Sequence, residues 1–312
     1  MKNKILIKIT LLFSLFSTFS VFGQLEVAIT MDDVPNKTFF ISSDKYSTLK
    51  TLDSLNIPIC IFINEGKIFK EDSITKKKLL TDWISRRYIT LGNHSYSHYR
   101  YSEVGFDVFS EDIKKGEIVT LELAKKNNKE LKYFRFPYND LGIDSLQHKK
   151  ISNFLEINNY QITPFTIESM DWMYNYVYEY YLSKNEVNMA NKIGLEYVNK
   201  TIEYFNYIEN ITQNNYGRKI RQVYMCHDNI LNSRYLPRIV VELKHKKYKF
   251  ISLKKALKDK VYNQEDKYYK KWGISWIYRW MNDQNERSNV LKNEPNTEEI
   301  ENLYNSILKE NK

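Results

Sequence analysis

His94 and His98 lie four residues apart, directly after an expected β-strand. Upstream, another apolar strand ends in two adjacent carboxylates, Asp32 and Asp33. One carboxylate and two imidazoles form a three-ligand set for a divalent metal ion, and this set leaves a coordination position open for water. The second carboxylate can then act as a base beside that water. These residue types and their order predict a metal-dependent hydrolase.

Three later motifs also place functional side chains at the ends of expected strands. They are an Arg-x-Pro-Tyr element with Arg135 and Tyr138, the pair Asp171-Trp172, and the segment Met225-Cys226-His227. Each motif has a structural alternative, because an arginine can serve an ion pair and an aspartate often caps a helix. Taken singly the motifs are weak, but five of them at strand ends in one chain indicate a site.

The apolar pattern alternates short strands with amphipathic helices. The expected strands are 25–31, 57–63, 88–91, 131–136, 161–167, 222–226 and 248–251. The expected helices are 47–55, 74–85, 108–126, 145–158, 236–244, 297–309 and a long one within 187–210. This alternation indicates parallel βα units, and hence an α/β fold that is either an open doubly wound sheet or a barrel. Barrels of this type build their sites at the carboxyl ends of the strands, where all five motifs lie.

The composition limits the classes of partner. The chain has 312 residues, which suits one large domain, and a formal net charge of +9. Its basic residues are scattered, so no nucleic-acid partner is expected, and the oligomeric state stays open. Cys60 and Cys226 both fall in expected strands, and two buried thiols are therefore expected rather than a disulfide. His148 and His245 lie among lysines and are expected to be solvated.

Residues 1–23 have the pattern of a signal peptide. Lys2 and Lys4 precede an apolar run that ends beside the small residue Gly23. A further lysine and several hydroxyl side chains interrupt the run, so a retained membrane anchor is disfavoured. We therefore expect an exported protein, periplasmic or secreted, without stable membrane insertion after cleavage.

The order Asp-Asp, His-Ser-x-x-His, Arg-x-Pro-Tyr, Asp-Trp and a strand-terminal His resembles the polysaccharide deacetylase family, also called the NodB-homology domain or carbohydrate esterase family 4. The resemblance covers about residues 25–259 and points to a divergent secreted branch. It implies a deformed (β/α) barrel with about seven parallel strands, and a helical, aromatic-rich C-terminal extension. The implied organisation is a signal peptide at 1–23, a deacetylase-like domain at 24–260 and an extension at 261–312 packed on the barrel. The implied substrate is an acetylated oligo- or polysaccharide, from which N-acetyl or O-acetyl groups are hydrolysed.

The resemblance assigns a metal ion to Asp33, His94 and His98. Zn²⁺ is the expected ion, with Co²⁺, Ni²⁺ or Mn²⁺ as alternatives, because two imidazoles and one carboxylate suit these cations. A bound divalent ion lowers the pKa of water by several units, which provides a nucleophile at neutral pH.

The resemblance also assigns the acid–base groups. Asp32 would be the general base, Arg135 would pair with it, and Asp171 would anchor Arg135. His227 would be the general acid that protonates the leaving amine or alcohol. The backbone N–H of Tyr138 would help to stabilise the oxyanion.

Some expectations concern the walls and the rim of the site. Trp172 and Met225 are expected in the apolar wall near the acetyl methyl group. Val34-Pro35 stands where the family has a glycine, and the aromatic segment Tyr174–Tyr181 follows the fourth motif. Both would narrow the rim and favour short oligosaccharides over long polymers, unless the tyrosines are buried packing.

The C-terminal extension contains an aromatic cluster. Trp272, Trp276 and Trp280 lie within nine positions and could line a sugar-stacking surface. Packing of the tail on the barrel is the favoured interpretation.

Three functions remain open from the sequence. The first is a secreted sugar deacetylase, which is favoured because every catalytic residue type is present. The second is a metal-dependent hydrolase of another small amide or ester on the same barrel, which the altered first motif suggests. The third is a non-catalytic carbohydrate-binding protein with a vestigial site, which should have lost a ligand or the base.

Overall fold

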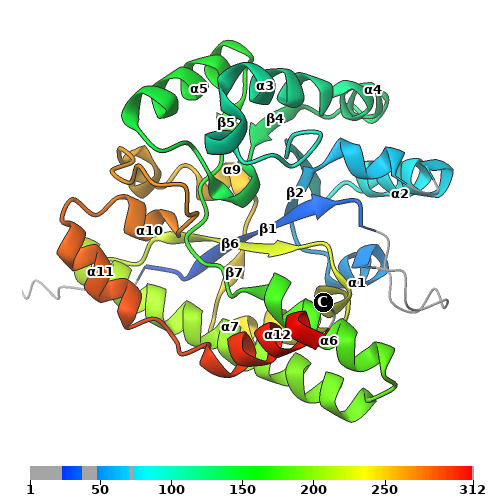
Figure 1. Cartoon of the computed structure of the whole chain (residues 1–312). Coiled ribbons are helices and arrows are strands. Elements are labelled where there is room, and N and C mark those ends of the chain that lie inside the picture. Colours follow the sequence, from blue (N-terminus) through cyan, green and yellow to red (C-terminus); the bar gives the residue numbers. More distant parts are fainter. Residues whose placement is uncertain (1–22, 37–47, 71–72, 311–312) are drawn as a thin grey trace, which may run out of the picture.

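A parallel β-sheet forms the centre of the molecule (Figure 1). The computed structural model describes residues 23–36, 48–70 and 73–310, so all of the expected signal peptide except Gly23 lies outside the described residues. The strands are β1 (Glu26–Val34), β2 (Ile59–Ile63), β3 (Ile89–Asn93), β4 (Leu131–Phe134), β5 (Gln161–Ile162), β6 (Arg221–His227) and β7 (Lys249–Phe250). Their order is β5-β4-β3-β2-β1-β6, and β7 pairs with the first residues of β1. All of these pairs are parallel, as the alternation of strands and helices predicts.

The two ends of the strand order come together after β5. Ile167, in the segment that follows β5, forms a parallel bridge with Tyr224 of β6. The N–H of Met225 donates to the carbonyl oxygen of Ile167 at 2.9 Å. This contact curls the sheet into a deformed barrel, which confirms the predicted fold class. Only the first two residues of the expected strand 161–167 are regular strand, because Pro164 has no N–H to donate to a ladder.

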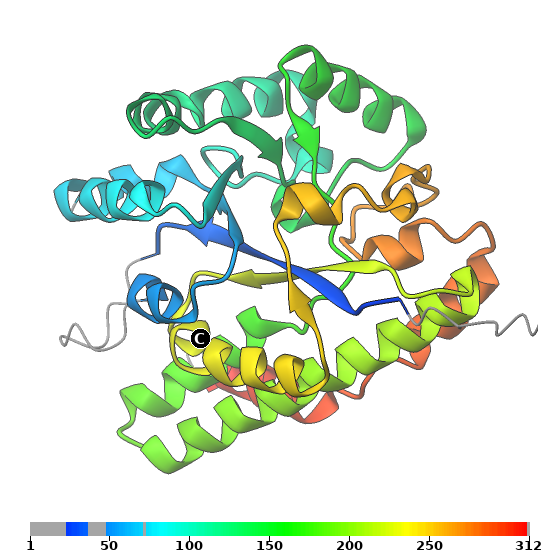
Figure 2. The same cartoon turned by 180° about the vertical axis from the view of Figure 1, so that it is seen from behind.

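Helices surround the sheet and connect its strands. Before the extension they are α1 (Thr48–Leu55), α2 (Ser73–Ser85), α3 (Tyr101–Lys115), α4 (Ile118–Lys126), α5 (Ser145–Ile157), α6 (Asp171–Ser183), α7 (Val187–Tyr216), α8 (Ile230–His245) and α9 (Leu253–Ala256). Figure 1 shows α3, α4 and α5 on the side of β4 and β5, and α6 and α7 on the opposite side of the sheet. Seen from behind, α8 lies between α1 and α7, against which it packs (Figure 2). Within the part of the chain that the structure describes, no helix is both long and apolar enough to cross a membrane.

The helix expected at 108–126 is two helices, α3 and α4, which corrects the prediction. Gly116 and Glu117 lie between them. A Cβ atom added at Gly116 would lie 2.6 Å from the carbonyl carbon of Ser95, in the loop that carries the two candidate metal-binding histidines. The break therefore allows close packing between the α3–α4 junction and this loop.

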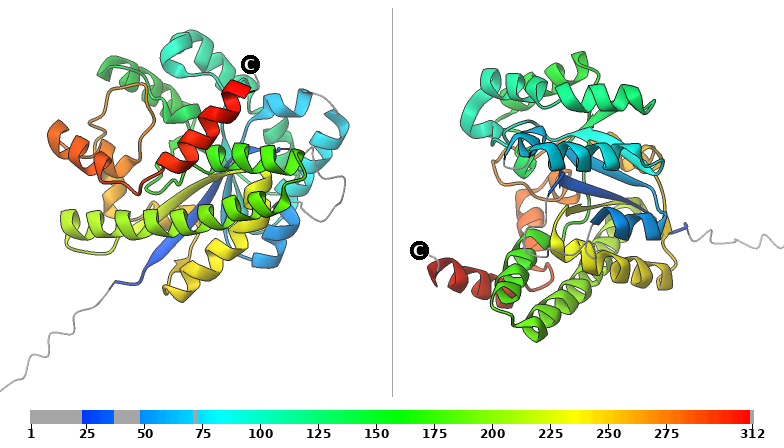
Figure 3. Two further views of the ribbon diagram at one scale, coloured as in Figure 1. Left: turned by 60° about the horizontal axis from the view of Figure 1, so that its bottom comes forward. Right: turned by 90° about the vertical axis from the view of Figure 1, so that its right-hand side faces the viewer.

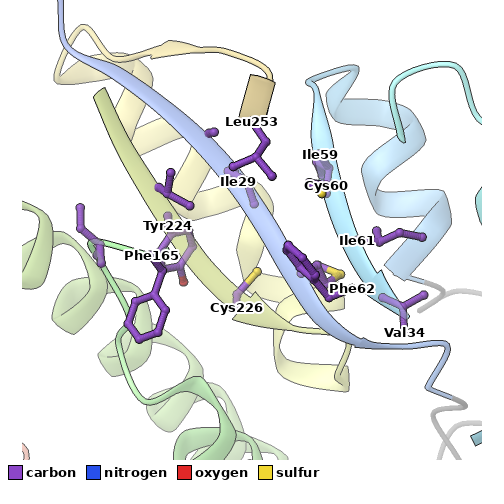
Figure 4. Packing of buried hydrophobic residues seen from close by; sticks show 14 of the residues in the cluster. Ile29, Val34, Ile59, Cys60, Ile61, Phe62, Phe165, Tyr224, Cys226 and Leu253 are labelled. Atoms are coloured by element: carbon purple, nitrogen blue, oxygen red, sulfur yellow. The ribbon is translucent and has the colours of Figure 1, made fainter. Parts of the chain in front are cut away.

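β1 and the two strands beside it contribute many buried residues to the core (Figure 4), which also contains residues of the surrounding helices. Nearly every residue of β1 is buried, on both faces of the strand. Figure 4 shows Phe62 of β2 and Cys226 of β6 beside β1. Cys60 and Cys226 are buried free thiols, as predicted. Acidic residues at the end of so apolar a strand are unusual, and they indicate a functional site.

The C-terminal extension packs against segments at the carboxyl end of the sheet. It contains α10 (Trp276–Arg279), α11 (Gln284–Lys292) and α12 (Glu298–Glu310). The N–H of Trp276 donates to the carbonyl oxygen of Phe165 at 3.0 Å. Figure 3 shows α12 alongside α6, and the two helices are in contact. Trp276 and Trp280 are buried, as expected of packing residues, whereas Trp272 is 61% exposed.

Candidate active site

A cavity of about 550 Å³ lies at the carboxyl ends of the strands. Eight of the residues predicted from the sequence line it: Asp32, Asp33, His94, His98, Tyr138, Trp172, Met225 and His227. The other two, Arg135 and Asp171, are buried and contact lining residues. The structure thus brings all the predicted site residues together from segments that are far apart in the sequence.

Asp33, His94 and His98 converge at one point of this cavity. Their candidate ligand atoms all lie within 4.8 Å of one another. Nε2 of His98 lies 3.5 Å from Oδ1 of Asp33, and Nε2 of His94 lies 4.0 Å from the same oxygen. That oxygen is buried and has no hydrogen-bond partner among the described residues. A buried carboxylate oxygen that faces two imidazole nitrogens fits a divalent cation.

The two histidines lie on a loop rather than on a helix. Two residues of this loop have positive φ angles, and the carboxylate of Asp112 accepts hydrogen bonds from the backbone N–H groups of Tyr96 and Ser97. Nδ1 of His94 lies 2.8 Å from the carbonyl oxygen of Arg135, which leaves Nε2 for a metal ion. The loop therefore directs both rings to one point without helical spacing.

The charge states of these residues also suit a metal ion. Burial lowers the pKa of His94 and of His98 to about 4, although the carboxylate of Asp33 acts in the opposite direction. Burial alone would raise the pKa of Asp33, but the Lys67 ammonium and the two histidines hold that pKa below its usual range. Nζ of Lys67 lies 3.1 Å from Oδ2 of Asp33, a contact that no sequence motif indicates. Neutral imidazoles and an ionised carboxylate are the forms that bind metal ions.

The two carboxylate oxygens of Asp32 have different surroundings. Its Oδ2 lies 3.5 Å from Nη1 of Arg135, and both side chains are buried. Nη2 of Arg135 donates to the hydroxyl of Thr30 at 3.1 Å, and the guanidinium lies against the rings of Phe62 and Phe165. Oδ1 of Asp32 is buried without a hydrogen-bond partner in the described part of the chain. Burial raises the pKa of Asp32, while Arg135 acts in the opposite direction, and such a carboxylate suits a general base.

Asp171 holds His227 and not Arg135, which corrects its expected role. Oδ1 of Asp171 lies 2.7 Å from Nδ1 of His227, and Oδ2 accepts the backbone N–H of His227 at 2.8 Å. The physical reason is the closure of the barrel. Because the chain bridges to β6 at Ile167, the first residue of α6 lies beside the end of β6. The contact leaves Nε2 of His227 for proton transfer.

Asn232 links this pair to α7, the longest helix described. Its Nδ2 donates to Oδ2 of Asp171 at 2.5 Å and to the carbonyl oxygen of His227 at 2.9 Å. Its Oδ1 accepts the hydroxyl of Tyr197 at 2.7 Å, and that hydroxyl lies 2.8 Å from the hydroxyl of Tyr224. All five side chains except that of His227 are fully or almost fully buried. Sequence reasoning missed Asn232, because a single asparagine inside a helix forms no recognisable motif.

Replacement of Asp171 by Asn is expected to lower the pKa of His227. Burial by itself would lower this pKa, but the Asp171 carboxylate, with Asp33 and Asp32, raises it to about 10. A raised pKa in the folded state stabilises the protein fully below the ordinary value of about 6.5, and this stabilisation is lost as the pH rises through about 10. Without the charge at position 171, the alkaline limit of kcat/KM should move to lower pH. NMR titration of the imidazole and a pH–rate profile measure the two effects.

Asn229→Ser provides a matched control for this prediction. Asn229 also donates to Asp171, at 3.1 Å, and caps α8 with its side-chain oxygen. Serine keeps the cap and leaves the charge of Asp171 in place, so the pKa of His227 should stay close to that of the unchanged protein. A His227 pKa that is the same in Asp171→Asn as in the unchanged protein would contradict the assigned pairing.

Aromatic side chains form much of the wall. Tyr138 and Trp172 are 47% and 43% exposed. Tyr138 has a φ of 56°, and its ring lies edge-on to that of His98, with the centroids 4.7 Å apart. Met225 and Trp172, which the sequence places in an apolar wall, both line this cavity.

The tyrosine-rich run does not narrow the cavity, which corrects the expected rim. The run belongs to α6, a helix absent from the expected elements, and Tyr174 and Tyr178 are fully buried at a spacing of four residues. Within 174–181, only Asn175 lines the cavity. Val34 is likewise buried in the core. These residues are therefore packing residues, which was the alternative interpretation of the sequence.

His148 is buried rather than solvated, which corrects another expectation. Its Nδ1 lies 3.3 Å from Oδ2 of Asp266, and its Nε2 lies 3.2 Å from the carbonyl oxygen of Gly142. The helical pattern around His148 contains no sign that the C-terminal extension covers it. His245 is exposed, as expected.

Sequence reasoning missed several residues that line the cavity. Among them are Arg100, Glu168, Asp228 and Gly273, whereas Trp272, which also lines the cavity, belongs to the aromatic cluster that the sequence indicated as a possible sugar-stacking surface. Burial and the charge of Asp171 raise the pKa of Glu168 to about 7. Trp272 and Gly273 come from the C-terminal extension, so the extension forms part of the cavity wall. The aromatic cluster in the sequence indicated that the extension could contribute to a site. The sequence does not show, however, which of its three tryptophans lines the cavity.

Comparison with known proteins gives a family match for part of the chain. Residues 22–148 match the sequence profile of the polysaccharide deacetylase family. The chain is 27% identical over 154 residues to the peptidoglycan-N-acetylglucosamine deacetylase of Bacillus cereus, and this match covers 48% of either protein. The chain thus spans about half the length of this curated relative.

The solved structures that match this chain have low sequence identity to it. A polysaccharide deacetylase from Bacillus cereus is 18% identical with a TM-score of 0.49, and the match covers 74% of this chain and 92% of that one. A CE4 family pseudoenzyme from Bacillus anthracis is 13% identical with a TM-score of 0.46, and here the match covers 75% and 66%.

Proposed function

Because this chain belongs to the polysaccharide deacetylase family, we propose that it is a metal-dependent hydrolase that removes acetyl groups from amino sugars of a glycan. Family membership supports the class of reaction, hydrolysis of a carbon–nitrogen bond that is not a peptide bond. The observation that carries the proposal is the convergence in one cavity of a candidate metal site and two separately held acid–base groups. Asp32 and Asp33 each have one buried carboxylate oxygen that no described residue contacts through a hydrogen bond.

Asp33, His94 and His98 would hold the metal ion. The unpartnered Oδ1 of Asp33 and the low pKa values of the two imidazoles support this assignment. When bound, a divalent cation would supply Lewis-acid chemistry, making water more acidic and polarising the acetyl carbonyl. Zn²⁺ is the proposed ion, because the donor set of two nitrogens and one oxygen suits it.

Asp32 would act as the general base through its unpartnered Oδ1, which takes a proton from the attacking water. Arg135 would keep the other oxygen in place and favour the ionised carboxylate. The N–H of Tyr138 would donate a hydrogen bond to the carbonyl oxygen of the acetyl group as negative charge develops on it.

His227 would act as the general acid. With Nδ1 held by Asp171, its Nε2 would donate a proton to the leaving nitrogen as the carbon–nitrogen bond breaks. An amine leaves poorly unless it is protonated, so a histidine whose pKa is raised to about 10 suits this role at neutral pH. Acetate and a free amino sugar would be the products.

The substrate of the reaction can be tested with a panel of acetylated glycans. Purified protein loaded with Zn²⁺ is expected to release acetate from N-acetylated chito-oligosaccharides faster than from O-acetylated xylan. If the protein hydrolysed a small unrelated amide or ester but released acetate from neither glycan, it would instead be a metal-dependent hydrolase of another small amide or ester. No hydrolysis of any compound would support a binding protein, although both acid–base residues and all three proposed ligands are present.

We also propose that the protein acts outside the cytoplasm. The support is the pattern of residues 1–23, with basic residues before an apolar run. Mass spectrometry of the protein from fractionated cells should find an exported form whose N-terminus is near Gln24. A cytoplasmic protein that retains residues 1–23 would contradict the proposal.

A further inference from the structure

We propose that the C-terminal extension supplies a sugar-binding subsite beside the candidate active site, with Trp272 as its stacking surface. The subsite would take the sugar next to the one that carries the reacting acetyl group. It therefore implies a substrate of at least two linked sugars. This inference rests on the proposed function, because that function supplies the class of ligand. The subsite and the proposed reaction can nevertheless be tested separately.

The exposure of Trp272 is the first observation. Trp276 and Trp280 of the same segment are 7% and 5% exposed and pack into the core, whereas Trp272 is 61% exposed. Trp272 lines the same cavity as the acid–base residues. A large exposed aromatic ring at the mouth of a polar cavity contributes nothing to the core, so its position indicates a binding role.

The backbone directly after Trp272 is held in place. A Cβ atom added at Gly273 would lie 2.0 Å from the carbonyl oxygen of Tyr138, so only glycine allows the segment to lie this close. Nδ2 of Asn139 donates to the carbonyl oxygen of Ile274 at 2.8 Å. Because these contacts already order the segment, a ligand that binds there loses little free energy to ordering of the backbone.

A continuous row of side chains connects Trp272 to the candidate metal site. The ring of Tyr138 lies edge-on to His98, and the guanidinium carbon of Arg100 lies 3.9 Å from the centroid of the Tyr138 ring. The same carbon lies 5.7 Å from the Trp272 centroid. Nη1 of Arg100 also approaches the carbonyl oxygen of Lys271, at 3.5 Å. The row therefore extends as one surface from the reacting centre to the extension.

The chemistry of this surface fits a sugar. A pyranose has an apolar face of C–H groups and an edge of hydroxyls. An indole ring offers an apolar face to the first, and the guanidinium of Arg100 offers N–H donors to the second. We therefore assign the neighbouring sugar of an N-acetylated oligosaccharide to Trp272 and Arg100.

Binding of N-acetylated chito-oligosaccharides of one to four sugars to metal-free protein tests this subsite. Titration calorimetry, or NMR at weak affinity, measures the dissociation constants in the absence of hydrolysis. In the unchanged protein, the disaccharide should bind distinctly more tightly than the monosaccharide. Trp272→Ala should reduce this preference on the order of tenfold, as expected for loss of one stacking contact, and Trp272→Phe should restore much of it. Thermal unfolding of each variant checks that the fold is retained.

Two outcomes would overturn the subsite. One is a disaccharide preference that Trp272→Ala leaves unchanged. The other is an unchanged protein that binds all lengths equally or binds none of them. Length-dependent binding that requires Trp272, without acetate release by the metal-loaded protein, would leave the subsite in place and contradict the proposed reaction instead.

Discussion

Asp32→Asn is expected to remove most of the turnover while leaving the metal ion bound. An amide cannot accept the proton of the attacking water, and loss of a general base costs roughly 10²–10⁴ in rate. The side chain of Asp32 keeps its place beside Arg135 at similar volume, so the fold should be retained. Acetate release and elemental analysis of the same preparation measure the two quantities.

Asp33→Asn is the matched control, because it makes the same chemical change at the neighbouring residue. Asp33, and not Asp32, presents its free oxygen to the two imidazoles. This variant should therefore lose metal affinity, and its activity should recover in part at high metal concentration. If both variants lost metal equally, the roles of base and ligand would be wrongly assigned.

His94→Ala combined with His98→Ala is expected to abolish metal binding. Purified protein should carry about one equivalent of a divalent ion, and the double variant should carry only background metal, because a single carboxylate remains. Elemental analysis after dialysis against metal-free buffer measures the content. Activity should fall at least as far as in Asp32→Asn.

His245→Ala is a suitable control for the histidine variants. His245 is exposed on α8 and lies outside the cavity, so its replacement should change neither metal content nor rate. Unchanged metal content in the double variant would place the metal elsewhere and contradict the site.

The fold could be predicted because short apolar strands alternate with amphipathic helices along the sequence, which is the pattern of βα units. Strands such as β1 and β2 are apolar on both faces, as buried parallel strands must be. The expected strand 161–167 was too long, because the chain leaves the sheet near Pro164 and joins β6 only through the bridge at Ile167. This closure depends on contacts between distant segments, which no local pattern reports.

The part of the candidate site that lies at strand ends could be predicted from the sequence. Parallel strands share one carboxyl edge, so Asp33, His94 and His227 had to meet there once the strands were known. The partner of Asp171 was not predictable, because it follows from the closure of the barrel. The order of the motifs indicates which residues lie in the site. The contact between Asp171 and His227, however, depends on the packing of α6 against β6.

The sequence did not indicate Lys67, and it did not distinguish Trp272 from the two other tryptophans of the extension. Lys67 contacts Asp33 from a short 3-10 turn, and Trp272 lines the cavity from the C-terminal extension. The three tryptophans of the extension lie in one short aromatic segment, yet Trp276 and Trp280 are buried and Trp272 is exposed. Position relative to the barrel, and not residue type, separates the exposed tryptophan from the two buried ones.

Acetate release from N,N′-diacetylchitobiose tests the central claim most directly, when it is measured before and after removal of metal. Protein treated with a chelator and dialysed should be inactive, and addition of one equivalent of Zn²⁺ should restore acetate release in the unchanged protein but not in Asp32→Asn. Acetate release that is equal with and without metal, or that persists in Asp32→Asn at the rate of the unchanged protein, would contradict a metal-dependent deacetylase.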